Sequence, residues 1–588
     1  MVVRLAAAAL LCACLPDPRG QCATDADCAV GPAGLFCAEG VCQGPPRGSV
    51  EALPSRAFAR SETLHVRAHV DRSHGTATGR VVFGGTAIDA AREPDGALGA
   101  EVPLSLAPAG VEGAVPFSVE LRDDLGHVTA LPASVLVDDQ PPRLTVDSAS
   151  VPSSAVLRGT QVTLRVTAQD MTAVTVAGAT KNADGSFAIS VNTTAAPPAA
   201  TLFDIAITGT DAVGNSAIVH ASIPITRLKY SVGSSSVTSL VLTDSVIFAL
   251  INHSDFLIAH RSDGTQLARP STGGNAFAEL ATDGTRLFFA RSDNQVCRMD
   301  SSGNIQECCG PFATLTSGPI LQGTTPIVGT TGTSATSQRL YAIVETNFTC
   351  GNVVGSATLA DFAATSPGIA ADGTIYSGAV QKVVIATFDG IGWTAQAASE
   401  TPHYTGSPAF RTNQILLSTS AATLDTYATP IAAAPTTIQI ATLGTVISAP
   451  TIAADGTAVV TTDDRHAIAL RPDGSVRWTV SLPDQATSPP THGAGDLIYI
   501  GTLSGDVLAL NLDDGATLWD YNAGAPIRGP LAPGCDGVLY AATDGAIVAL
   551  VTDAKGLANS PWPRAAHDVR GTGDSRHPLR AADGTCLE

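Results

Sequence analysis

The sequence predicts an all-β protein in which two β-sandwich domains precede an eight-bladed β-propeller. Only 15% of the 588 residues are charged, whereas long amphipathic helices need many Glu and Lys residues on their exposed faces. Two consecutive segments of about 90 residues alternate between apolar and polar residues, as strands of a sandwich do. From residue 227 onward a unit of about 40 residues with four predicted strands recurs, which is typical of propeller blades.

The size and charge of the chain limit its possible functions. A chain of 588 residues is too long for one hydrophobic core, so several domains are expected. The formal net charge of −20 is spread along the chain, whereas nucleic-acid binding requires clustered cations. We therefore expect soluble domains and no nucleic-acid partner.

The first residues, MVVRLAAAALLCAC, predict an export signal. Their apolar run, residues 5–13, is too short to span a bilayer. Residues 11–14 resemble the lipobox of bacterial lipoproteins, which implies that residues 1–13 are removed and that Cys14 carries a lipid. On that resemblance the protein is anchored by lipid in the cell envelope, and Leu15 after the cysteine points to the outer membrane of a Gram-negative cell. The alternative is an ordinary signal peptide that is cut near Gly20.

Export changes how the cysteines are interpreted, because an oxidising compartment favours disulfides. Of the twelve cysteines, Cys12 leaves with the signal and Cys14 carries lipid, so that 12 − 2 = 10 remain, an even number. Four of them lie in CATDADCAVGPAGLFCAEGVC, and their spacing differs from the paired C-x-x-C of zinc sites. We predict a two-disulfide knot within residues 14–48, made by Cys22, Cys28, Cys37 and Cys42.

Residues 49–140 and 141–226 form the two predicted sandwich domains. In LHVRAHV, Leu64 and Val66 fall on one strand face, and His65 and His69 fall on the other. The turn sequences DDLGH and DAVGN occupy corresponding places near the ends of the two segments. Both segments resemble bacterial immunoglobulin-like domains in size and in strand pattern.

Two patterns in these domains allow a metal site but do not require one. His65 and His69 share a strand face, which an exposed polar face also explains. The Asp residues of DDLGH and DAVGN could hold calcium, but tight turns use Asp and Gly in any case. No metal ligand is therefore predicted.

Residues 227–573 are predicted to form the propeller. The clearest units are SAPTIAADGTAVVTTDDRHAIALRPDGSVRWTV and SPPTHGAGDLIYIGTLSGDVLALNLDDGATLWDY, each with an Asp-Gly hairpin before a strand that contains Trp. Residues 228–232, LKYSV, align with such an outer strand and are predicted to complete the last blade, which would close the ring. The eight unit starts lie near Thr238, Ala278, Ser317, Ser366, Ser407, Ala449, Pro489 and Gly529.

The adjacent cysteines of VCRMDSSGNIQECCGP fall on the predicted outer strand of the second unit, away from the axis. A two-residue turn pairs Asp300 with Ile305 and Cys297 with Cys308, within disulfide range. A three-residue turn would select Cys309 instead.

We expect disulfides here rather than a redox centre. Cys350 is a candidate partner for the cysteine that is left over. Cys535 and Cys586 could tie the C-terminal tail, residues 574–588, to the last blade.

The segments ALNLDDGATLW, ALRPDGSVRW and SPWPRAAHDVRGTG resemble those of PQQ-like propellers. This group includes quinoprotein dehydrogenases and non-catalytic scaffolds such as the lipoprotein BamB. In the dehydrogenases, the resemblance implies a quinone on the axis, covered by an adjacent-cysteine disulfide and stacked on Trp. Here Trp393, Trp478 and Trp519 lie on predicted outer strands, and Trp562 lies in the closing segment, residues 560–573. We therefore expect no Trp at the axis.

The predicted function is a non-catalytic binding or scaffolding module. The propeller of the lipid-anchored envelope protein would bind a protein or glycan partner without a cofactor. The alternative is a PQQ-dependent periplasmic dehydrogenase, and a hydrolase with an unrecognised site is a third possibility. The motifs G-x-S-x-G, H-E-x-x-H and G-x-x-x-x-G-K are absent from the sequence, so no catalytic or cofactor-binding residue is assigned. His567, Asp568 and Arg570 could form a site, but a polar network that anchors the closing segment explains them better.

Overall fold

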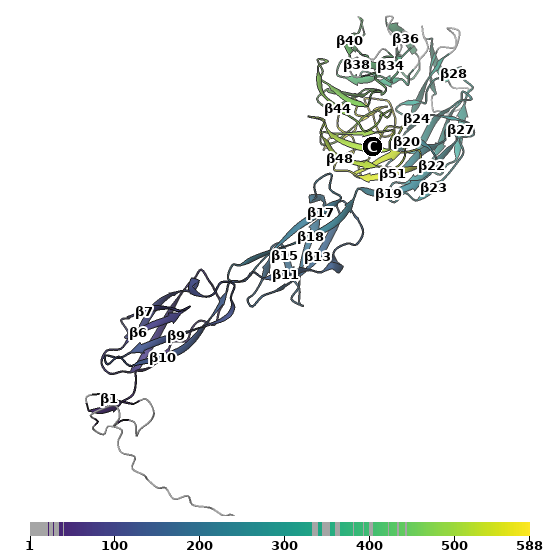
Figure 1. Cartoon of the computed structure of the whole chain (residues 1–588). Coiled ribbons are helices and arrows are strands. Elements are labelled where there is room, and N and C mark those ends of the chain that lie inside the picture. Colours follow the sequence, from purple (N-terminus) through teal and green to yellow (C-terminus); the bar gives the residue numbers. More distant parts are fainter. Residues whose placement is uncertain are drawn as a thin grey trace, which may run out of the picture. The chain divides into compact units, whose positions relative to one another are not determined.

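The computed structural model describes residues 22, 28, 35–38, 40–331, 339–343, 353–358, 365–379, 382–391, 393–398, 404–420, 423–431, 434–440 and 444–588 (Figure 1). These residues form strands joined by turns, with short 3-10 turns at Leu104–Leu106, Ser148–Ser150 and Thr193–Ala195. The all-β prediction is confirmed. Within this part of the chain there is no helix with the length and hydropathy needed to cross a membrane.

The chain divides into two units. The first comprises residues 1–153, 161–192 and 204–223, and the second comprises residues 154–160, 193–203 and 224–588. The second unit thus begins earlier than the predicted boundary at residue 227. Within this unit the carboxylate of Asp553 binds Arg158 Nε at 3.1 Å and Arg227 Nη2 at 2.8 Å.

The first unit starts with the cysteine-rich segment, where β1 (Phe36–Ala38) pairs with β2 (Val41–Gln43) and places Cys37 opposite Cys42. Cys22 forms a disulfide with Cys37, and Cys28 is also disulfide-bonded. The side chain of Cys42 lies outside the described part, as does Cys14.

The first sandwich segment forms one eight-stranded sheet in the order β3-β5-β8-β7-β6-β9-β10-β4. Leu64 and Val66 of β5 are buried and His65 is exposed, so the predicted alternation is confirmed. The strands are β3 (Arg47–Val50), β4 (Phe58–Ala59), β5 (Thr63–Arg72), β6 (Thr78–Phe83), β7 (Thr86–Arg92), β8 (Leu98–Pro103), β9 (Glu112–Arg122) and β10 (Val128–Asp138).

The second segment forms two four-stranded sheets, ordered β11-β13-β16-β15 and β12-β18-β17-β14. The turn DAVGN joins the last two long strands of the segment, as DDLGH does in the first. The strands are β11 (Arg143–Val146), β12 (Val156–Leu157), β13 (Gln161–Gln169), β14 (Thr175–Val176), β15 (Ala179–Lys181), β16 (Phe187–Asn192), β17 (Leu202–Thr210) and β18 (Ser216–Thr226).

From Leu228 onward the described strands form eight antiparallel sheets, nearly all in simple chain order. The first three contain β20 (Val237–Leu242), β21 (Val246–Ile251), β22 (Asp255–His260) and β23 (Gln266–Ala268); β24 (Ala276–Thr282), β25 (Arg286–Arg291), β26 (Val296–Asp300) and β27 (Ile305–Cys309); and β28 (Thr314–Leu315), β29 (Ile320–Gln322), β30 (Thr325–Thr331), β31 (Arg339–Ile343) and β32 (Val353–Thr358).

The next four contain β33 (Gly368–Ile369), β34 (Thr374–Gly378), β35 (Val383–Phe388) and β36 (Trp393–Ala398); β37 (Ala409–Arg411), β38 (Gln414–Ser418), β39 (Thr423–Ala428) and β40 (Thr436–Gln439); β41 (Thr451–Ile452), β42 (Ala458–Thr461), β43 (His466–Leu470) and β44 (Val476–Ser481); and β45 (Thr491–Gly493), β46 (Leu497–Gly501), β47 (Asp506–Asn511) and β48 (Thr517–Asn522).

The last sheet joins the two ends of this region. It has the order β19-β51-β50-β49 and combines β19 (Leu228–Gly233) with β49 (Ala532–Pro533), β50 (Val538–Ala542) and β51 (Ala546–Val551). The predicted closure by LKYSV is therefore confirmed. Among the first strands, β20 contacts both β24 and β49, so the first sheet adjoins the second and the last. These contacts and the closure define a β-propeller.

The repeated Trp and Asp-Gly positions pack one sheet on the next. Trp478 of β44 is buried, and its indole donates a hydrogen bond of 2.7 Å to the carbonyl of Leu512. Gly515, with φ of +74°, lies so close that a Cβ there would approach the Trp478 ring to 2.9 Å. Glycine is thus required both for the hairpin and for the contact between sheets.

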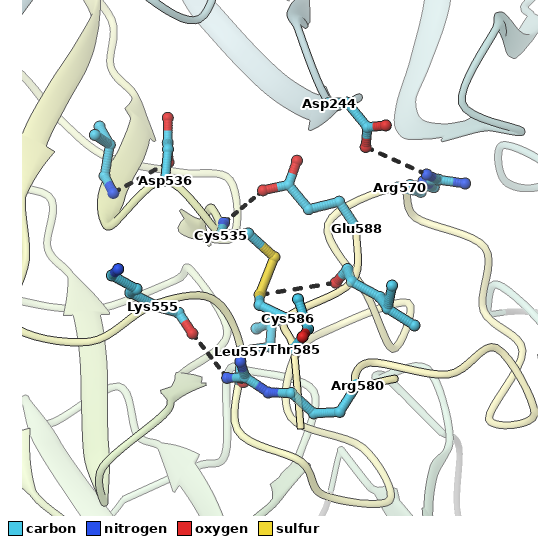
Figure 2. Close-up of a disulfide and its surroundings, with 12 residues drawn as sticks. Asp244, Cys535, Asp536, Lys555, Leu557, Arg570, Arg580, Thr585, Cys586 and Glu588 are labelled. Atoms are coloured by element: carbon cyan, nitrogen blue, oxygen red, sulfur yellow. Dashed lines mark hydrogen bonds and ion pairs between the residues drawn. A yellow bond between two sulfur atoms is a disulfide. The ribbon is translucent and has the colours of Figure 1, made fainter. Parts of the chain in front are cut away.

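The C-terminal tail docks on the last sheet, as Figure 2 shows. A disulfide joins Cys535 to Cys586, and the Glu588 carboxylate accepts a hydrogen bond from the backbone N–H of Cys535. Glu588 also pairs with the buried guanidinium of Arg261. The tail is thereby covalently tied to the propeller, at the cysteines that the sequence suggested.

Candidate binding site on the propeller axis

A pocket of about 290 Å³ lies where the first strands of the propeller sheets begin. Because every sheet contributes to one pocket, the pocket lies on the propeller axis. The contributing residues coincide with, or adjoin, the predicted unit starts: Thr238, Ala278, Pro319, Ser366, Ser407, Ala449, Pro489 and Gly529.

The pocket lining consists mostly of small residues, namely Ala, Gly, Pro, Ser and Thr, with larger apolar side chains such as Leu240 and Ile320 and the exposed charged side chains of Glu279 and Arg528. Ser366 is 9% exposed, and its hydroxyl has no hydrogen-bond partner among the described residues. Thr405 is exposed on the same lining. The exposed side chain of Thr405 is therefore available to hydrogen-bond a ligand.

The closing segment supplies the rest of the lining, and its backbone binds the first strands. Six of its carbonyls accept hydrogen bonds of 2.7–2.9 Å from six different sheets. The donors are the N–H groups of Leu242, Thr282, Leu321, Ile369, Ile452 and His492, and the acceptors are the carbonyls of Val569, Arg570, Thr572, Gly573, Trp562 and Pro563, respectively.

Arg564 links the closing segment to the last sheet. Its Nε donates to the Leu531 carbonyl at 2.9 Å, and Nη1 donates to the Asp568 carbonyl at 2.8 Å. Nη2 lies 3.4 Å from the carbonyl of Leu240 in the first sheet. Burial lowers the pKa of Arg564 to about 10. The Arg564 guanidinium therefore stabilises the contact between the closing segment and the sheets.

Asp568 organises the turn of the closing segment. Its carboxylate accepts hydrogen bonds from the N–H of Thr572 at 3.0 Å and from the Thr572 hydroxyl at 2.5 Å. Nδ1 of His577 lies 3.0 Å away and Nδ1 of His567 lies 3.6 Å away. Although burial opposes it, the nearby rings of His567 and His577 hold the pKa of Asp568 far below its usual range.

These contacts match the polar network predicted for His567 and Asp568. Arg570 does not join them. Its guanidinium instead faces Asp244, with Nη2 3.6 Å from the carboxylate (Figure 2).

Trp562 corrects the expectation that no Trp would lie at the axis. It lines the axial pocket, although only 1% of its surface is exposed. Its ring packs edge-on against Phe410, with centroids 4.8 Å apart. The repeat alignment placed Trp562 in the closing segment, but it could not show that this segment crosses the axis.

The paired cysteines do not form an adjacent disulfide. Cys308 is bonded to Cys297 across β26 and β27, with Cα atoms 4.0 Å apart. The predicted pairing of Asp300 with Ile305 is wrong, because a bulge pairs Ile305 with Met299 instead. Cys309 is buried in the interior between sheets, and Cys350 lies outside the described residues.

The residues at the axis do not fit the quinone site that the PQQ-like resemblance implies. Such a site needs an accessible aromatic face and free charged groups that fix the carboxylates of the cofactor. Trp562 is buried against Phe410, and the cysteine pair lies on an outer strand. Of the arginines in the lining, Arg564 is bound to carbonyls and Arg528 pairs with Asp544.

His65 and His69 lie on the exposed face of β5 within a charged network. Both ring nitrogens of His65 lie 2.8 Å from carboxylates, those of Glu93 and Glu101. Hydrogen bonding to these two groups, chiefly Glu101, raises the pKa of His65. His69 lies 3.6 Å from Glu51. The polar-face interpretation accounts for both residues.

Comparison with known proteins agrees with the strand topology. The family described as "Outer membrane protein assembly factor BamB" matches residues 437–566. Among curated protein sequences, none matches this chain significantly.

Three solved structures illustrate the similarity, each at 12% sequence identity. The computationally designed protein Ika8 has a TM-score of 0.46 and covers 55% of this chain and 99% of its own. BamB from Moraxella catarrhalis has a TM-score of 0.44, and the match covers 56% of this chain and 100% of the BamB chain. The C-terminal WD40 domain of Sif2 has a TM-score of 0.45, and the match covers 56% of this chain and 98% of the Sif2 chain.

Replacing Arg564 with Met should destabilise the propeller by roughly 3 kcal/mol or more, because several buried carbonyls lose their donor. The exposed Arg528, which also lines the pocket, provides the control. Arg528→Met should change the stability by less than about 0.5 kcal/mol. Urea unfolding followed by Trp fluorescence measures both, and equal stabilities of the two variants would contradict the role of Arg564.

The propeller should lose stability in mild acid through His492. This side chain is 1% exposed and hydrogen-bonds Thr451, and burial lowers its pKa to about 4 from the usual 6.5. The folded state therefore binds fewer protons, so its stability is complete above pH 6.5 and falls between pH 6.5 and 4, by about 3 kcal/mol. His492→Gln should flatten this part of the stability–pH curve, and an unchanged slope would exclude His492 as its source.

Proposed function

We propose that this chain is a lipid-anchored cell-envelope protein whose eight-bladed propeller is a non-catalytic binding or scaffolding module. In this proposal residues 49–140 and 141–226 are immunoglobulin-like domains, residues 227–573 are the propeller and residues 574–588 are its tail. The first residues provide the export signal and the lipid site at Cys14. The match of residues 437–566 to the BamB family supports an envelope scaffold.

The axial pocket is the observation that carries the binding function. Its sides come from the small residues that begin the sheets, while Arg564 and Asp568 of the closing segment are occupied by intramolecular hydrogen bonds. A lining of small apolar residues interspersed with hydroxyls suits recognition of a segment of a protein or glycan by shape and hydrogen bonding. The alternative, a PQQ-dependent dehydrogenase, needs groups that are engaged elsewhere.

Filling the pocket should abolish partner binding without unfolding the propeller. Thr405→Trp places a large ring at an exposed position of the lining, and Thr479→Trp places the same ring on the exposed side of β44 as a matched control. We expect envelope components that co-purify with the cross-linked wild type to be reduced about tenfold by Thr405→Trp, a loss of about 1.4 kcal/mol. They should be retained by Thr479→Trp.

Equal capture by both variants would place the binding surface away from the axis. Saturable binding of PQQ in the presence of calcium, with dye reduction by an alcohol or sugar, would instead support the dehydrogenase.

Membrane attachment should depend on Cys14. Cys14→Ser removes the only thiol that the lipobox resemblance assigns to the lipid, so the protein should become soluble in the periplasm or remain uncleaved. Fractionation with mass spectrometry of the N-terminus distinguishes these products. A Cys14→Ser protein that is cleaved elsewhere and still sediments with membranes would contradict lipid anchoring.

A further inference from the structure

Three aspartates of the first unit direct carboxylate oxygens to one point. Asp138 ends β10, Asp170 directly follows β13, and Asp211 directly follows β17. One oxygen from each lies within 4.8 Å of the others. The three come from segments that are far apart in the sequence, so the fold itself assembles the cluster.

Two of the carboxylates are oriented by their own turns. Asp211 Oδ1 accepts hydrogen bonds from the N–H groups of Val213, Gly214 and Asn215, at 2.7–2.9 Å. Asp170 Oδ1 accepts one from the N–H of Thr172 at 2.8 Å. These contacts are ordinary for Asp in turns and do not by themselves indicate a ligand.

Asp138 differs, because it is fully buried without a counter-charge. Its exposed fraction is 0%. Its carboxylate has a long contact of 3.4 Å with the N–H of Gln140, and it competes with Asp170 for the single Thr172 hydroxyl proton, at 3.3 Å against 3.1 Å. Among the described residues, no Lys, Arg or His forms an ion pair with any of the three aspartates.

A buried carboxylate without a cation is costly unless it binds a metal or a proton. The Asp138 carboxylate is fully buried beside those of Asp170 and Asp211, and its contacts come from one N–H group and one shared hydroxyl. A negative charge that the protein itself does not neutralise points to an external cation.

The corresponding turn of the first sandwich segment supplies an internal comparison. Asp123 accepts hydrogen bonds from the N–H groups of Leu125 and His127, as Asp211 does in its own turn. The ring of His127 lies 3.3 Å from the Asp123 carboxylate. The equivalent residue in the second turn is Asn215, whose neutral amide donates to Asp211 at 2.9 Å. The first turn thus places a histidine beside its aspartate, whereas the second turn has a neutral asparagine at that position.

We propose that Asp138, Asp170 and Asp211 form a calcium-binding site. Calcium prefers carboxylate and carbonyl oxygens at 2.3–2.6 Å in flexible geometry, so two of its ligands can lie up to about 5 Å apart. The observed cluster fits within that limit. The ion would hold the end of β10 against the turns that follow β13 and β17, and so make the connecting residues 139–142 more resistant to proteolysis.

Titration of the chelator-treated full chain with calcium chloride tests the site. We expect one calcium ion to bind per chain and to raise the melting temperature of the first unit by several degrees, since a ligand of the native state stabilises it. Magnesium chloride at the same concentration should have a smaller effect, because magnesium demands a closer octahedral shell. Proteolysis between β10 and β11 should slow when calcium is present.

Variants separate binding from folding. Asp138→Asn and Asp170→Asn should weaken calcium binding at least tenfold, and Asp138→Asn should keep the calcium-free melting temperature because it removes a buried charge. Asp123→Asn, in the turn that places a histidine beside its aspartate, should leave calcium binding unchanged.

The proposal is overturned if calcium produces neither heat nor a thermal shift in the wild type at about 1 mM, at the weak end of extracellular sites. It is also overturned if the Asp138→Asn and Asp170→Asn variants bind calcium as the wild type does, or if magnesium acts equally well.

Discussion

The peptide carbonyls of the closing segment are the constraint on which the propeller depends. They accept hydrogen bonds from the first strands of six sheets, Arg564 reaches the carbonyl before the first strand of the last sheet, and Trp562 packs on Phe410 of the remaining one. A ring of sheets has no covalent closure of its own. Here β19 pairs with β51 and so joins the first and last parts of the propeller chain. The closing segment hydrogen-bonds the strands that surround the axis.

This arrangement explains why strongly shifted pKa values occur near the axis without implying catalysis. Perturbed ionisable groups often mark active sites, but ion-pair networks that stabilise a fold perturb them as well. Arg564 and Asp568 are buried, and both are satisfied by backbone groups or by neighbouring side chains of the same segment. The side chains that remain exposed at the axis include those of Thr405, Glu279 and Arg528.

Local patterns allowed much of the fold to be predicted from the sequence. Alternation identified β5, and the resemblance of LKYSV to an outer strand identified the closure by β19. The disulfide Cys297–Cys308 follows from the hairpin register, but the bulge that pairs Ile305 with Met299 has no comparable signal in the sequence.

The sites were harder to predict, because they depend on contacts between segments that are distant in the sequence. Trp562 reaches the axis only because the closing segment crosses it. Asp138, Asp170 and Asp211 each follow or end an ordinary strand. Asp211 belongs to DAVGN, for which calcium was one of two interpretations, but Asp138 and Asp170 resemble other turn aspartates in the sequence. Only the convergence of the three in space sets them apart.

Native-state hydrogen exchange of the six amides that donate to the closing segment tests this account most directly. If the closing segment fastens the ring, the amides of Leu242, Thr282, Leu321, Ile369, Ile452 and His492 should exchange with one common opening free energy, close to that of global unfolding of the propeller. Widely different opening free energies among these amides, with some exchanging by local fraying, would show that each sheet is held by its neighbours alone.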